Sequence, residues 1–122
     1  MYKLKFKDGT ILDCIVIYGS SIYFQNSNRD TLEFQFKDNY SMDELYNIFN
    51  DKSKTEAITI IDEDTNNEYT HTDYVVFISQ NKQPVVIEKS TPDTPEQTEL
   101  RISITMGQLS YIEKQLETLL NK

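Results

Sequence analysis

The chain has 122 residues, a hydrophobic fraction of 38% and a formal net charge of −8. This length fits one domain, which can bury a core without disulfides or metals. The negative charge disfavours nucleic-acid partners, since phosphate backbones repel it, and no apolar run approaches the ~18 residues that a membrane span needs.

The single cysteine and the N-terminus indicate the compartment of synthesis. Cys14 closes no intrachain disulfide, and its apolar neighbours favour a role as core filler. Lysines near the N-terminus are not followed by a continuous apolar stretch, so the sequence predicts no secretory signal. We expect folding in a reducing cytoplasm.

The first 36 residues predict a four-stranded antiparallel meander. Apolar residues alternate with lysines from Tyr2 to Lys7, which is typical of a half-exposed strand, and Asp8-Gly9 is a strong hairpin signal. Further strands are expected over 11–18, 21–25 and 31–36, with a turn at Gly19-Ser20 and a polar loop over 26–30.

A helix is predicted near residues 42–50. Ser41 and Glu44 have the spacing of a capping box, and apolar residues follow at helical spacing. We expect this helix to pack on the sheet. Strands are then predicted over 56–62 and 68–80, the latter bent around Thr72-Asp73, followed by a turn at 82–84 and a strand over 85–87.

Residues 89–99, rich in Thr, Pro and acidic side chains, are interpreted as a linker between a body of residues 1–88 and an arm of residues 100–122. The arm is predicted to be a strand over 100–105 and an amphipathic helix over 106–120, with a capping box at Thr105 and Gln108. The expected partner-binding residues of this helix have coiled-coil-like spacing and are Leu109, Ile112, Leu116, Leu119 and Leu120.

So short a helix is marginal in water and must rest on another surface. Its own body, a second copy of the chain and a partner protein all remain open as that surface. The alternating strand before it could also add to the edge of a neighbouring sheet. We therefore treat the arm as the main candidate for association.

Candidate chemistry is sparse. Asp62, Asp64 and Asn66 alternate as oxygen ligands do at the start of a calcium loop, but Asn67 stands where the sharp turn needs glycine, so they are weak metal candidates. His71 is the only histidine, and no motif supplies it with a nucleophile. The sequence predicts no catalytic residue, no cofactor, no small-molecule substrate and no enzymatic activity.

These elements together predict an α+β fold. We expect a mostly antiparallel sheet, with a barrel-like curvature as one option, one packed helix, and a strand-helix arm after a linker. Strand order is left open.

Short motifs follow one another in a characteristic order along nearly the whole chain. They are the Lys7-Asp8-Gly9 turn, Arg29-Asp30-Thr31-Leu32-Glu33-Phe34-Gln35-Phe36, the Ser41-Met42-Asp43-Glu44-Leu45 helix start, residues 59–62, and residues 101–108 followed by 111–116. In this order the chain resembles small proteins from the tail modules of Gram-positive siphophages, most of which have no assigned activity.

The resemblance implies a virion-associated tail, baseplate or fibre accessory protein, made in the host cytoplasm and then carried in the tail. Its implied partners are other tail proteins, further copies of itself through the C-terminal helix, or both. The alternative is a small acidic phage-encoded inhibitor or modulator that binds a basic host protein surface, with salt-sensitive binding as its hallmark.

Overall fold

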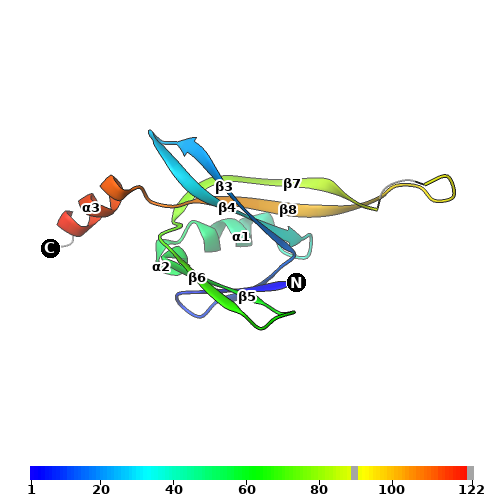
Figure 1. Cartoon of the computed structure of the whole chain (residues 1–122), viewed down its shortest axis with the longest axis horizontal. Coiled ribbons are helices and arrows are strands. Elements are labelled where there is room, and N and C mark those ends of the chain that lie inside the picture. The colour runs from blue at the N-terminus through cyan, green and yellow to red at the C-terminus, as the bar shows by residue number, and fades with distance from the viewer. Residues whose placement is uncertain (89–90, 121–122) are drawn as a thin grey trace.

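A computed structural model describes residues 1–88 and 91–120. The fold is α+β, with two four-stranded antiparallel sheets and short helices (Figure 1). This confirms the predicted class and the antiparallel pairing. The two sheets do not close into a barrel.

The first sheet has the strand order β2-β1-β5-β6. Its strands are β1 (Tyr2–Phe6), β2 (Ile11–Cys14), β5 (Ala57–Asp62) and β6 (Glu68–Thr72). The predicted turn at Asp8-Gly9 joins β1 to β2, and Gly9 has φ +94°, a conformation that glycine adopts without a steric penalty. Leu4, Phe6 and Ile58 are buried on one face, and lysines cover the other face of β1.

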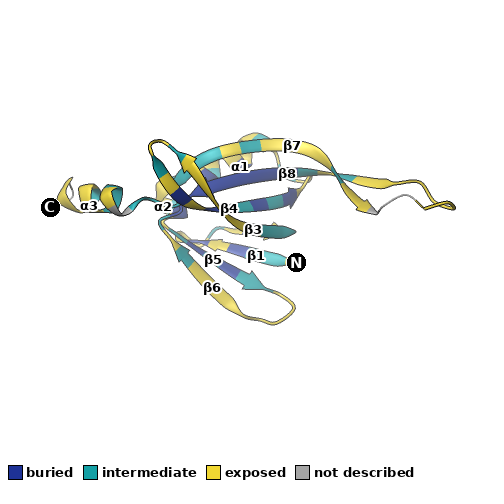
Figure 2. Cartoon of the chain, turned by 45° about the horizontal axis from the view of Figure 1, so that its top comes forward, coloured by how far each residue is buried: buried dark blue, intermediate teal, exposed yellow. Residues whose placement is uncertain are grey.

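The second sheet has the strand order β3-β4-β8-β7. Its strands are β3 (Val16–Phe24), β4 (Ser27–Lys37), β7 (Val76–Glu88) and β8 (Gln97–Gly107). The apolar side chains of β4 and β8 are its most buried part (Figure 2). Phe34, Phe36, Ile102 and Ile104 are fully buried, as expected for the two central strands.

Helix α1 (Met42–Phe49) connects the two sheets through its last aromatic ring. The ring centroid of Phe49 lies 5.3 Å from that of Phe6 in the first sheet and 5.4 Å from that of Phe34 in the second. The Ser41 hydroxyl accepts a hydrogen bond of 2.9 Å from the Glu44 N–H, so the predicted N-cap is confirmed. A short helix that the sequence did not predict, α2 (Lys52–Thr55), follows.

The predicted course of the chain between residues 11 and 30 is wrong in two respects. The strand expected over 11–18 is divided at Ile15, where the chain leaves the first sheet and enters the second. β3 continues through the expected turn at Gly19-Ser20 because each of its residues pairs with β4. The chain reverses instead at Gln25 and Asn26, with φ of 49° and 62°, and the expected loop over 26–30 largely belongs to β4.

The predicted bend near Thr72 is confirmed, since β6 ends there and Asp73 has φ 65°. The turn expected at 82–84 is wrong, because β7 runs straight through Pro84. β7 is an edge strand, and an edge strand tolerates a residue that cannot donate a backbone hydrogen bond.

The strand expected in a separate arm belongs to the body. Residues 100–105 lie within β8, which pairs with β4 on one side and β7 on the other. The expected linker over 89–99 therefore connects two paired strands. Its last three residues, 97–99, already belong to β8. Lys89 and Ser90 lie outside the described residues. The last helix, α3 (Tyr111–Leu120), begins five residues later than expected because the strand extends to Gly107, and residues 121–122 of the expected arm also lie outside the described part.

Candidate docking site on the C-terminal helix

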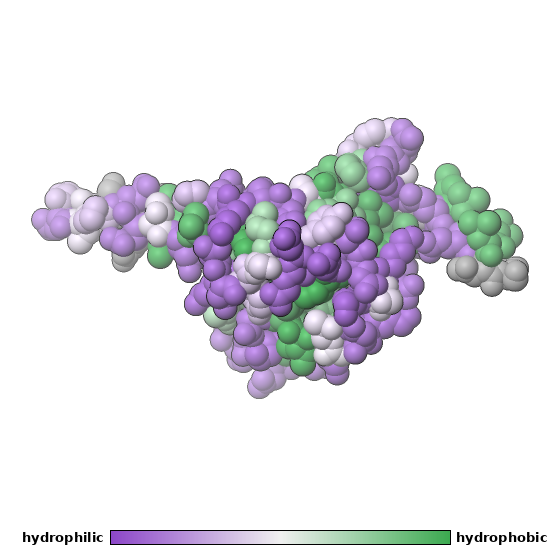
Figure 3. Space-filling view, turned by 180° about the vertical axis from the view of Figure 1, so that it is seen from behind, coloured by the Kyte–Doolittle hydropathy of each residue, from purple (hydrophilic) through white to green (hydrophobic). Residues whose placement is uncertain are grey.

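The apolar residues of α3 face solvent. The exposed fraction is 71% for Ile112, 53% for Leu116, 65% for Leu119 and 82% for Leu120, and we call these four residues the α3 apolar face. Leu109, which precedes the helix, is half-buried. The helix projects from one end of the molecule, and its apolar side chains gather there in the space-filling view (Figure 3). An exposed run of this kind is unusual for a helix that needs tertiary contacts to be stable.

The polar side of α3 attaches it to the body. Three ion pairs make this attachment, namely Glu113 with Arg29, Lys114 with Asp73 at 3.6 Å, and Glu117 with Lys52 at 3.3 Å. An amphipathic helix on a globular domain normally buries its apolar stripe and exposes its charges. Here the arrangement is reversed, with the charges against the body and the apolar face in solvent.

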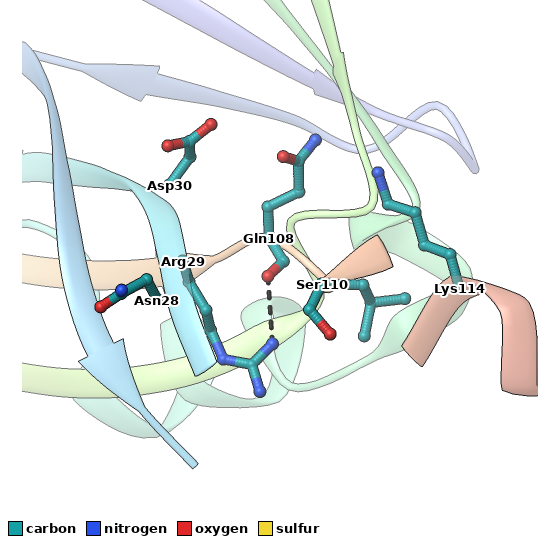
Figure 4. A pocket seen from close by; sticks show the side chains of 7 residues that line it. Asn28, Arg29, Asp30, Gln108, Ser110 and Lys114 are labelled. Atoms are coloured by element: carbon teal, nitrogen blue, oxygen red, sulfur yellow. Dashed lines mark hydrogen bonds between the residues drawn. The ribbon is translucent and has the colours of Figure 1, made fainter. Parts of the chain in front are cut away.

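Arg29 is the centre of this attachment. Its side chain is fully buried, yet each guanidinium nitrogen has an acceptor. Nε donates to the Phe24 carbonyl at 3.0 Å, Nη1 donates to the Gln108 carbonyl at 3.1 Å (Figure 4), and Nη2 donates to Glu113 Oε2 at 2.9 Å. A buried guanidinium is stable only when it is paired and hydrogen-bonded in this way.

The Glu113 carboxylate completes the pair and caps its own helix. The hydrogen bond from Arg29 is the main reason why the pKa of Glu113 is lowered to about 2, and the same contact raises the pKa of Arg29. Glu113 Oε1 also accepts from the Ser110 N–H at 2.8 Å, while the Ser110 hydroxyl accepts from the Glu113 N–H at 3.3 Å. This reciprocal pair is a capping box. It replaces the one expected at Thr105 and Gln108, which is wrong because Thr105 lies in β8.

The segment between β8 and α3 is held by backbone contacts to β4 and to the loop that follows β6. The Gln108 N–H donates to the Asp30 carbonyl and the Leu109 N–H donates to the Asp73 carbonyl, each at 2.9 Å. A Cβ atom on Gly107 would lie 3.0 Å from Ile78 Cδ1 and 3.1 Å from Arg29 Cδ. The glycine therefore lets this segment pass close to the buried arginine.

Two open grooves lie beside the base of α3. One has a volume of about 260 Å³ and is lined mainly by polar side chains from the start of β4 and the start of α3, among them Arg29, Asp30 and Lys114 (Figure 4). The other, of about 310 Å³, lies between α3 and the start of β7, and its apolar lining consists of Val75, Val76, Phe77 and Leu109. Leu109 lines both grooves, so apolar surface continues from the helix towards the body.

The weak metal candidates lie in the turn between β5 and β6. Asp62 Oδ1 accepts from the Asp64 N–H at 3.0 Å, and Asn66 has φ 59°, so these side chains and backbones serve the turn itself. Within residues 1–88 and 91–120, no three His, Cys, Asp or Glu side chains are grouped closely enough to hold a metal ion. His71 is half-buried in β6 with its ring centroid 5.8 Å from that of Tyr74.

Cys14 is fully buried in β2. Burial raises the pKa of its thiol to about 12, and its sulfur donates to the Gln35 carbonyl at 3.3 Å. A thiol of this kind is unreactive at neutral pH. The interpretation of Cys14 as core filler agrees with its burial.

Arg29 is the site residue that sequence reasoning missed. It stands in a polar stretch, Asn26 to Asp30, that was expected to be a loop, and nothing in its neighbours signals burial. The spacing of Ser110 and Glu113 was a detectable capping signal, since the two residues are three apart.

Comparison of the chain with protein-family models, with curated proteins and with solved structures found no match. Among the described residues, no helix combines the length and the apolar composition needed to cross a membrane.

Proposed function

We propose that this chain is a non-enzymatic structural or assembly protein of a siphophage tail, baseplate or fibre, and that it acts by docking through α3. The observation that carries the proposal is the reversed attachment of α3, with its charges on the body and its apolar face in solvent. Burying each of the four side chains of the α3 apolar face in a partner would contribute about 1.5–3 kcal/mol to the free energy of binding. A coiled-coil-like or bundle contact suits their spacing.

The resemblance to siphophage tail-module proteins supplies the biological setting of the proposal. It implies that the chain is made in the host cytoplasm and carried in the virion, with tail proteins or further copies of itself as partners. The negative charge fits protein partners better than nucleic acid. No cofactor and no small-molecule substrate belong to this proposal.

The test is incorporation into tails of a phage that encodes this chain. We expect the wild-type protein to copurify with tails and the double variant Ile112→Glu, Leu116→Glu to be lost from them. The matched control is Ile11→Glu with Tyr69→Glu, two residues that are 54% exposed on other surfaces. Tails that retain the α3 variant at the wild-type level, or that never contain the chain, would contradict the proposal.

A second candidate function is favoured by the far end of the molecule, where the outer part of the β7–β8 hairpin extends from the body (Figure 1). Its exposed apolar residues are Val86, Ile87 and Leu100, and the acidic residues Asp93 and Glu96 lie in the connection between the strands. Apolar side chains next to negative charge suit a basic protein surface, as the inhibitor or modulator hypothesis requires.

That hypothesis predicts capture of a host protein by the immobilised chain at low ionic strength and its release by salt. Asp93→Asn with Glu96→Gln should weaken capture, whereas the α3 double variant should not. Capture that is insensitive to salt, or that depends on α3 instead, would argue against it.

A further inference from the structure

The structure does not show which partner covers the α3 apolar face. The charged side chains around the helix favour one kind of partner over the others. We infer that the occupant is the α3 apolar face of a second copy of this chain. The inference rests on the docking role proposed above and adds the identity of the partner.

The charge near α3 favours a second copy as the partner. The chain as a whole carries a formal net charge of −8, so two copies repel one another over most of their surface. The charged side chains of α3 and their partners on the body cancel, because three are cationic and three are anionic: Arg29, Lys52, Lys114, Asp73, Glu113 and Glu117. The ion pairs around α3 therefore add no net charge to this repulsion.

All six of these charged side chains are already paired within one chain. Glu113 is held by Arg29, Lys114 by Asp73 and Glu117 by Lys52. A strongly charged partner would have to compete for these contacts, whereas an identical apolar face needs none of them. A two-fold contact brings the same patch together from both chains, which suits a face made only of aliphatic side chains.

The length of α3 limits the strength of its contact with a second copy. The ten residues of α3 span about 15 Å, which is too short to supply the roughly 800 Å² per partner of a typical stable interface. Self-association through α3 is therefore expected to be weak and dependent on concentration. Copies held side by side in a particle would have a high effective concentration, so a weak contact suffices there.

The test is sedimentation equilibrium of the full chain from micromolar to millimolar concentration. The wild-type mass should rise from one chain towards two, while Ile112→Glu with Leu116→Glu stays at one chain. The corresponding double lysine variant, Ile112→Lys with Leu116→Lys, should also stay at one chain. Mixing the glutamate and lysine variants should raise the mean mass above that of either variant alone, because opposite charges then meet across the contact.

The control Ile11→Glu with Tyr69→Glu should associate like the wild type. A wild-type mass of one chain at millimolar concentration would overturn the inference; loss of the α3 variant from tails would then still support docking to another tail protein. Wild-type association without pairing of the glutamate and lysine variants would also overturn it, since α3 would then contact a different surface of the second copy.

Discussion

Arg29 is a charged side chain in the interior, and its guanidinium connects the β3–β4 hairpin to α3. Its acceptors are the backbone carbonyls of Phe24, Gln25 and Gln108 and the Glu113 carboxylate. If the carboxylate is removed, a buried cation loses the counter-charge with which it is paired, which costs more than the loss of an exposed ion pair.

Glu113→Gln should therefore lower the free energy of unfolding by about 1–3 kcal/mol. Urea denaturation followed by circular dichroism measures this change. The matched control is Glu117→Gln on the same helix, whose partner Lys52 is exposed, and its effect should stay within about 0.5 kcal/mol. Equal effects of the two variants would contradict the account of Arg29.

The pairing of Arg29 with Glu113 also predicts that the stability of the chain depends on pH in the acid range. The pKa of Glu113 is lowered to about 2 in the folded chain by the hydrogen bond from Arg29, against about 4.3 in an unfolded chain. A lowered pKa contributes stability that is present above the unfolded value and is lost as the pH falls through the folded value. The stability difference between wild type and Glu113→Gln should thus shrink between about pH 4.5 and pH 2. A difference that stays constant over this interval would show that the charge of Glu113 is not responsible.

Strand β8 determines which residues belong to the body and which can form an arm. It pairs with β4 over Arg101 to Gly107 and with β7 over nearly its whole length, and Ile102, Ile104 and Met106 are fully buried. The portion of the chain that can be independent of the body is therefore α3, not a strand and a helix together.

A chain that ends at Thr98 should not fold cooperatively, because the second sheet loses a central strand and three core side chains. A chain that ends at Leu109 should keep both sheets and unfold cooperatively, with the reduced stability expected for Arg29 without Glu113. Thermal unfolding followed by tyrosine circular dichroism distinguishes the two. Cooperative unfolding of the shorter chain would contradict the position of β8.

Local signals predicted those elements whose structure depends on near neighbours. β1, its turn at Gly9 and the Ser41 cap of α1 follow from alternation, turn chemistry and capping, and the structure agrees with them. The turn expected at Gly19-Ser20 failed because pairing with β4 overrides a local turn preference. The Thr- and Pro-rich stretch near Pro92 resembles a linker in composition, and composition does not reveal that its two ends join paired strands.

Part of the candidate site could also be predicted, namely the part that depends on residues close together in the sequence. The spacing of Ile112, Leu116 and Leu119 is visible in the sequence, and it identified the face that the structure leaves exposed. The burial of Arg29 depends on contacts with residues up to 84 positions away, which no local pattern encodes.

At the scale of the whole molecule, the two projecting features lie at opposite ends of the long axis, α3 at one end and the β7–β8 hairpin at the other (Figure 1). The body between them holds a single core that both sheets and α1 share. The shape suits the proposed role in assembly, since partners could bind at both ends. The proposed docking depends above all on one claim, that the α3 apolar face is open to solvent in the free chain.

Solvent paramagnetic relaxation of methyl groups in the dilute, methyl-labelled chain tests that claim most directly. With a soluble relaxation agent, the methyl signals of Ile112, Leu116 and Leu119 should broaden as strongly as those of Ile11, while those of Leu4 and Ile58 stay sharp because they are fully buried. Sharp Ile112, Leu116 and Leu119 signals in the dilute monomer would mean that the helix covers its apolar face with its own body, and the docking account would be wrong.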